Sequence, residues 1–179
     1  MEEMKIKGYK AFNSDLSNRY GALFEVNGTY SVDGEAIFGN NGNGFHFCER
    51  LEDTLRYFDA MDGEVQIAEV IGSKDIREYN DEYYGYYDMY SATKLEVVRV
   101  LTRTEIINMF SSLPGYRVVR FVQGYRLSDE EKAWFKLRYL DDSDVLKAIA
   151  YYQEGDKEAY SPEKAYTYMK RERKRYSDK

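Results

Sequence analysis

The sequence is short of the residues that form covalent and metal cross-links. Among 179 residues it has one cysteine, Cys48, and one histidine, His46. A single cysteine excludes an intramolecular disulfide and a cysteine-rich zinc site, and a single histidine excludes a histidine cluster around a metal. Any metal site would have to rely on carboxylates, so we expect none.

Long apolar runs are also absent. No stretch reaches the roughly 18–20 apolar residues of a membrane helix. The charged start of the chain, Met1 to Lys5, lacks the apolar segment of a signal peptide. We therefore expect a cytoplasmic protein that makes no membrane contact.

Basic residues are fewer than acidic ones. The 26 basic residues face 32 acidic ones, and the net charge of −6 argues against nucleic-acid binding by the surface as a whole. The basic end of the chain, Lys170 to Arg175, is the exception. It predicts at most weak binding of nucleic acid or of an acidic partner, and it is equally typical of a solvated helix end whose cations complement the helix dipole.

Tyrosine is present in excess, at 19 residues. It packs as a large apolar body with a polar tip, which suits interfaces and grooves, although an AT-rich genome would also raise its number. Six tyrosines fall between Tyr79 and Tyr90 in a segment without periodicity, which we expect to be a loop. This loop predicts a recognition surface for a protein partner; alternatively, it folds over the sheet with several rings buried. The candidate binding residues are Tyr83, Tyr84, Tyr86, Tyr87 and Tyr90.

The first part of the chain alternates in the manner of strands. Asn27-Gly28 indicates a hairpin turn. Leu51, Leu55 and Phe58 share one face of an expected helix. The expected strands cover residues 5–12, 22–26, 29–32, 45–48, 65–71 and 92–101, and the expected helices cover residues 49–58 and 104–110.

The last third of the chain is typical of helices, although Val118 to Val122 also fits a last strand. Ser128 and Glu131 form a capping box, Asp142 or Ser143 caps a second helix, and Pro162 begins a third. The sequence therefore predicts an α+β protein. Residues 1–112 form a twisted, mainly antiparallel sheet with one or two packed helices, and residues 113–179 form a helical C-terminal segment that packs on it.

Short blocks in the first part resemble a known type of domain. They run from Gly8-Tyr9-Lys10-Ala11-Phe12 to Gly44-Phe45-His46-Phe47-Cys48 and Ala68-Glu69-Val70. In this order they resemble an uncharacterised domain of phage and prophage proteins, over about residues 6–106. The resemblance implies a mobile-element origin, in a bacterial host cell, and little chemistry. Together with the small acidic chain and the tyrosine-rich loop, it predicts an accessory protein that binds a host or phage protein. Inhibition of a host-defence system is one version of that function.

A looser likeness is to mono-ADP-ribosyltransferase domains. Tyr9-Lys10 stands at the first motif of that fold, the strand around His46 at the second, and Glu96 or Asp88 near the third. Lys10 replaces the arginine of the family, and its Ser-Thr-Ser is missing. This likeness implies, as the alternative function, an active or degenerate enzyme that uses NAD, with Lys10, His46 and Glu96 as catalytic candidates. Otherwise we expect no cofactor.

The two unique residues lie on one face of the expected strand 45–48. Strand alternation places Phe45 and Phe47 in the core and turns His46 and Cys48 to the other side. His46 then faces solvent or a hydrogen-bonded pocket, or it lines a cleft near Lys10. A Cys–His nucleophile pair is not favoured, because two residues on one strand lie side by side and the imidazole is poorly aimed at the sulfur.

Overall fold

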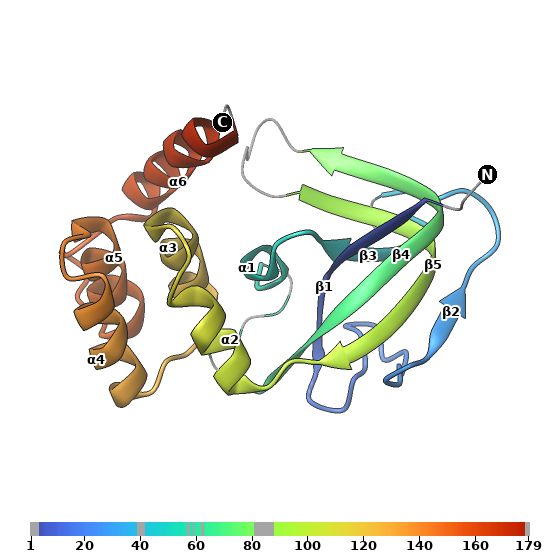
Figure 1. Ribbon diagram of the computed structural model, residues 1–179, viewed down its shortest axis with the longest axis horizontal. Coiled ribbons are helices and arrows are strands. Elements are labelled where there is room, and N and C mark those ends of the chain that lie inside the picture. The colour runs from blue at the N-terminus through green and yellow to red at the C-terminus, as the bar shows by residue number, and fades with distance from the viewer. Residues whose placement is uncertain are drawn as a thin grey trace. The chain divides into compact units, whose positions relative to one another are not determined.

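The chain forms two compact units in a computed structural model (Figure 1) that describes residues 4–38, 42–56, 58, 60, 61, 63–80 and 88–177. The sheet unit comprises residues 1–58 and 63–101, and the helical unit comprises residues 59–62 and 102–179. The boundary falls at Leu101, earlier than the expected residue 112, because the helix that follows packs within the helical unit.

All strand pairs of the sheet unit are antiparallel, and they close on themselves. The strand order is β2-β5-β3-β1-β4, and β4 also pairs with β5, so that β1, β4, β5 and β3 form a ring. Such closure pairs both edges of a strand and leaves an enclosed interior for side chains. The strands are β1 (Lys5–Asn13), β2 (Thr29–Ser31), β3 (Phe45–Cys48), β4 (Val65–Asn80) and β5 (Asp88–Val100).

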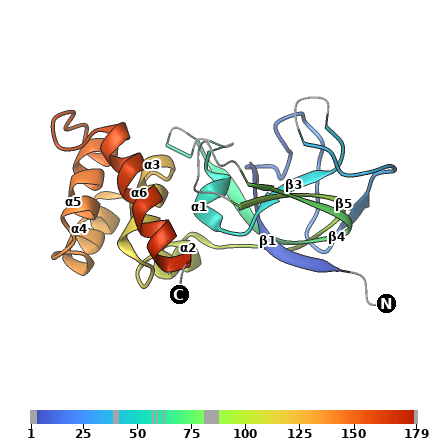
Figure 2. The ribbon, with the colours of Figure 1, turned by 90° about the horizontal axis from the view of Figure 1, so that it is seen from above.

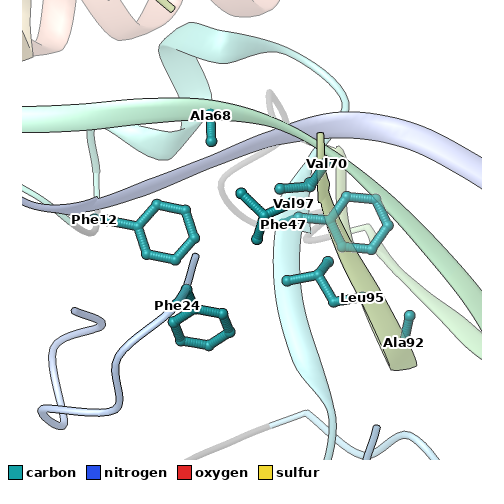
Figure 3. Packing of buried hydrophobic residues seen from close by; sticks show 8 residues of the cluster. All are labelled: Phe12, Phe24, Phe47, Ala68, Val70, Ala92, Leu95 and Val97. Atoms are coloured by element: carbon teal, nitrogen blue, oxygen red, sulfur yellow. The ribbon is translucent and has the colours of Figure 1, made fainter. Parts of the chain in front are cut away.

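The interior of this ring is filled by a cluster of apolar side chains (Figure 3). The ring of Phe47 fits there because glycines face it from two strands. A Cβ atom on Gly72 would lie 2.4 Å from Cε1 and Cζ of Phe47, and one on Gly8 would lie 2.8 Å from Cδ2. Phe45 packs against the same cluster, so the predicted core face of β3 is confirmed. The cluster consists of Phe12, Phe24, Phe47, Ala68, Val70, Ala92, Leu95 and Val97.

The expected strand over residues 22–26 is wrong. A single bridge joins Ser17 and Leu23 there, because Phe24 turns into the core while its neighbours stay exposed. The turn at Asn27 does form, with a φ of 63° and a bond from the Gly28 N–H to the Glu25 carbonyl. It does not make a hairpin, since β2 pairs with β5 instead.

The expected helix over residues 49–58 is shorter than predicted. Helix α1 spans only Leu51–Thr54, and Arg50 provides no side-chain cap for it. Leu51 and Leu55 are nevertheless buried, as their spacing predicts. Contacts of α1 with β1 and β3 make it the packed helix of the predicted α+β fold.

The helical unit gathers around α3 (Figure 2). Val118 to Val122, which also fits a strand, lies inside this helix. Pro114 precedes its first turn, and buried Val118, Val119, Phe121 and Val122 follow helical spacing, so packing overrides the strand preference of valine. The helices are α2 (Arg103–Phe110), α3 (Gly115–Gly124), α4 (Asp129–Arg138), α5 (Ser143–Ala148), the π-helix η1 (Ile149–Gln153) and α6 (Pro162–Ser177).

The expected helix starts of this unit are confirmed. Ser128 and Glu131 form the capping box of α4, and Asp142 caps α5. Ser161 accepts a bond from the Lys164 N–H at the start of α6. Thr102 and Glu105 form a second capping box, at α2.

Buried Gln153 closes the end of α3. Its amide nitrogen donates to the carbonyls of Val122 (2.6 Å) and Tyr125 (2.9 Å), and its oxygen accepts from the Leu127 N–H (3.0 Å). The two carbonyls belong to the end of α3, where carbonyls lack partners inside the helix, and the Leu127 N–H belongs to the segment that follows. The π-helix that ends at Gln153 therefore supplies the cap that α3 needs.

Substituting Gly72 tests the packing around Phe47. Gly72→Ala should lower the free energy of unfolding by about 1–3 kcal/mol, because its Cβ overpacks the Phe47 ring. Gly63→Ala is the control, since its Cβ would meet nothing within 4 Å. Urea unfolding followed by circular dichroism measures both. Adding Phe47→Leu to Gly72→Ala should cost less than the sum of the two single changes; strict additivity would contradict the contact.

Substituting Gln153 tests the cap of α3. Gln153→Met should destabilise the protein by about 2–4 kcal/mol, because three buried backbone groups lose their partner. Gln123→Met is the control, since Gln123 is half-buried and its amide bonds to the side chains of Arg120 and Tyr152. Fluorescence of Trp134, the single tryptophan, follows unfolding of this unit. Equal losses in the two variants would refute the capping role.

Candidate functional site

The sheet unit contains a pocket of about 650 Å³. It is lined by Tyr9 to Ala11 of β1, by β3 and the residues before it, and by Asn18 to Tyr20. Arg56 and Phe58, which follow α1, and Tyr79 of β4 complete part of its wall. Its volume falls in the range of about 300–1,000 Å³ that is usual for ligand sites.

The lining of this pocket is basic, although the chain as a whole is acidic. Lys10, Arg19 and Arg56 line it, and the described lining residues include no aspartate or glutamate. Low-dielectric walls that carry one sign of charge concentrate the field within a cleft. The pocket is therefore suited to a group that carries negative charge.

Lys10 is the innermost source of this charge. The side chain is partly buried as a whole, and its Nζ donates to the His46 carbonyl at 2.7 Å. Burial of the amine lowers the pKa of Lys10 from 10.5 to about 8, and the Cys48 sulfur acts in the opposite direction. Lys10 forms no ion pair with any described residue.

His46 lies beside Lys10 on the same wall. Its ring stacks on Phe38, with 5.2 Å between the ring centroids. Burial and the Lys10 ammonium lower the pKa of His46, and a hydrogen bond with the backbone of Ile37 opposes them. Its Nε2 is buried and has no hydrogen-bond partner among the described residues.

Two of the three catalytic candidates meet in this pocket, and the third does not line it. Lys10 and His46 come together, as the second interpretation of His46 predicts. Glu96 is exposed on β5, opposite Thr29 of β2 on one side and Ile71 of β4 on the other. A catalytic role for these residues stays a prediction.

Cys48 and the tyrosine-rich segment have separate outcomes. Cys48 is buried against Met89 and Phe38 while it lines the pocket. Tyr90 belongs to β5, where it stacks on Phe47 at 5.5 Å. The expected loop is therefore shorter than residues 79–90, because β4 extends to Asn80 and β5 begins at Asp88. Tyr83, Tyr84, Tyr86 and Tyr87 lie outside the described residues.

The basic C-terminal run is partly used within its own helix. Arg171 and Arg175 contact the Glu172 carboxylate at 3.1 and 3.6 Å, and Arg173 is buried. Arg19, by contrast, is a pocket residue that sequence reasoning missed. The sequence offers one weak signal, which is the neighbouring Tyr20. In the structure the Arg19 guanidinium lies 5.7 Å from the centroid of that ring.

Residues 6–109 match the family described as Domain of unknown function (DUF7666). The chain belongs to this family. The match includes β1, β3 and the other strands, so every described residue of the pocket lies within the DUF7666 domain. It also agrees in extent with the uncharacterised domain that the sequence resembles over residues 6–106. No curated protein and no solved structure matches the chain.

No helix in the described ranges has both the length and the apolar character needed to cross a membrane. Over the same residues, no group of three or more His, Cys, Asp or Glu side chains is placed to hold a metal ion.

Replacing Lys10 tests the cost of its buried charge. Lys10→Met should raise the free energy of unfolding at pH 7 by about 1–3 kcal/mol, because an unpaired ammonium leaves the interior. Between pH 8 and 10.5 the unfolded state binds more protons than the folded state, since burial lowers the pKa of Lys10 to about 8. The wild type should therefore gain stability across this window, and Lys10→Met should not.

Urea titrations at several pH values measure this difference. Lys7→Met is the matched control, since Lys7 is an exposed lysine on the same strand. If Lys10→Met raises the free energy of unfolding by the same amount at pH 7 and pH 10.5, the amine is not both charged and buried in the folded protein.

Proposed function

We propose that this DUF7666 protein is a binding protein rather than an enzyme, and that the pocket of the sheet unit holds part of its partner. The observation that carries the proposal is a formed pocket of about 650 Å³ with basic and aromatic walls and no acidic residue among its described lining. Pockets of this kind, largely apolar with a few convergent polar groups, are the usual sites of ligand recognition.

The polar groups of the pocket are suited to holding rather than to transforming a ligand. Glu96 lies outside the lining, so no carboxylate of the described wall can act as a general base or stabilise a cationic intermediate. Cys48 is buried against Met89 and Phe38, where a thiol is poorly exposed to a ligand. These features favour binding over the alternative of an NAD-using enzyme.

The proposed partner is a host or phage protein in the cytoplasm of a bacterial host cell, with inhibition of a host-defence system as one version. The resemblance to phage and prophage domains supports this partner class. Arg19 and the largely exposed Tyr20 support it independently, because both line the pocket. Arginine and tyrosine are enriched among the residues that dominate protein interfaces.

Reversing the charge of Arg19 tests the proposal. Arg19→Glu should abolish or strongly reduce capture of the partner from a bacterial lysate, as measured by quantitative mass spectrometry. The exposed side chain of Arg19 makes no ion pair with a described residue, so the fold should be unaffected. Lys7→Glu is the control, with the same change of charge elsewhere on the unit. If both variants capture the same proteins as the wild type, the pocket is not the binding site.

A further inference from the structure

We infer that the pocket binds a group that joins a negative charge to a planar ring, with Lys10 and Arg19 holding the charge and the aromatic wall holding the ring. The inference rests on the proposed function only in taking the pocket as a binding site. The negative charge is that of a phosphate or a carboxylate. The ligand can be a free small molecule or an acidic and aromatic segment of a protein partner.

The charge requirement follows from the cations of the pocket. Lys10 and Arg19 both line it, and neither forms an ion pair with a described residue. The Lys10 ammonium uses one of its three donors on the His46 carbonyl, so two remain for a ligand. A buried cation without a counter-charge is costly, and a bound anion would offset that cost.

The ring requirement follows from the aromatic wall. Phe38 contacts two other rings of the lining, with 5.2 Å between its centroid and that of His46 and 5.1 Å to that of Tyr79. Tyr79 keeps 39% of its surface exposed, so the wall offers an aromatic surface that the protein does not cover. Stacking on such surfaces is tolerant of ring identity, since it uses the π-face.

His46 contributes a partly buried polar side chain to the wall of the pocket. Its ring lines the pocket, and its Nε2 has no hydrogen-bond partner among the described residues. Buried polar atoms of native proteins nearly always have one. This nitrogen is closed to solvent in the structure, so a ligand heteroatom would reach it only after the surrounding side chains move, and His46 is assigned to the aromatic wall alone.

Pyridoxal 5′-phosphate is a suitable labelling reagent, because it combines a phosphate, a planar ring and an aldehyde. The neutral Lys10 amine attacks the aldehyde carbon, water leaves and an imine forms. Borohydride then delivers hydride to the imine carbon and gives a stable secondary amine. Peptide mass spectrometry of the full chain locates the label and measures its rate at each lysine.

At pH 7 Lys10 should be labelled at least about 10-fold faster than Lys7, because more of its amine is neutral and the pocket holds the phosphate. Adenosine 5′-monophosphate should slow labelling of Lys10 several-fold, whereas adenosine and inorganic phosphate at the same concentration should protect less. Labelling of Lys10 at the rate of Lys7, or equal protection by adenosine, would overturn the inference.

Variants separate charge from reactivity. Lys10→Arg should retain binding of adenosine 5′-monophosphate in calorimetry, and Lys10→Met should lose most of it, with both folded by circular dichroism. Equal binding by the two would overturn the role of Lys10. Arg19→Glu should remove protection at Lys10 without removing the amine, so unchanged protection would overturn the role of Arg19.

Two further experiments identify the source of the ligand and separate a failure of this inference from a failure of the proposed function. Protection by a Glu-Tyr-Glu peptide but not by Gln-Tyr-Gln supports a protein segment, whereas protection by the nucleotide alone supports a small molecule. If the nucleotide protects Lys10 while Arg19→Glu still captures every protein, protein binding at the pocket fails and the anion site stands. If Arg19→Glu loses capture of proteins and the nucleotide does not protect Lys10, the anion site fails and protein binding at the pocket stands.

Discussion

The phenyl group of Phe47 lies where β1, β4 and β5 converge. The strands can close on themselves only if they leave space for this side chain. Gly8 and Gly72 provide the space, since a Cβ atom on either would collide with the aromatic ring. Seating Phe47 there fixes the register of β3 against its neighbours, because a slip of one residue would turn the phenylalanine outward. Gly44, with a φ of 104°, brings the chain into β3 close to Ser91 and Ala92.

The position of Phe47 has a consequence for chemistry. Alternation along β3 turns His46 away from the cluster that Phe47 fills, while the pairing of Tyr9 with Cys48 brings β1 alongside. Lys10 then reaches the His46 carbonyl across the strand pair. The pocket thus inherits its geometry from the core packing, and its charge is maintained at a cost in stability. Proteins retain such costs mainly at functional sites.

Local patterns predicted the parts of the fold that depend on neighbouring residues. The core face of β3 and the caps at Ser128, Asp142 and Ser161 depend on two to four residues of sequence, and each is confirmed. Residues 118–122 were ambiguous because a short apolar run fits either a buried strand or a helix. Tertiary packing favours the helix. Phe110 of α2 stacks on Phe121 with 3.9 Å between the ring centroids.

The candidate site was predictable only in part for the same reason. Lys10 and His46 were candidates because both fall on motif positions of the looser family likeness, and His46 is also the single histidine of the sequence. Arg19 was missed because its loop has no period, and only the tertiary fold brings it to the pocket. Residues 22–26 were misassigned because Phe24 serves the core from an irregular segment, which a pattern of alternating residues cannot distinguish from a strand.

The net charge of the chain does not predict the charge of the pocket lining, and the arrangement of the acids explains the difference. A chain of net charge −6 is not expected to attract anions. Several carboxylates of the sheet unit are engaged away from the pocket: Glu69 binds Arg99 at 2.8 Å, Asp75 accepts from the Ala36 N–H, and Glu35 lies 3.7 Å from Arg77.

These acids cancel local positive charge elsewhere and leave Lys10 and Arg19 without such partners among the described residues. At ordinary ionic strength, salt screens the interaction between charges that are more than about 10 Å apart. A ligand inside the pocket therefore interacts more strongly with the charges of the pocket wall than with those of the distant surface. The sign of the pocket, rather than that of the chain, therefore decides what can enter it.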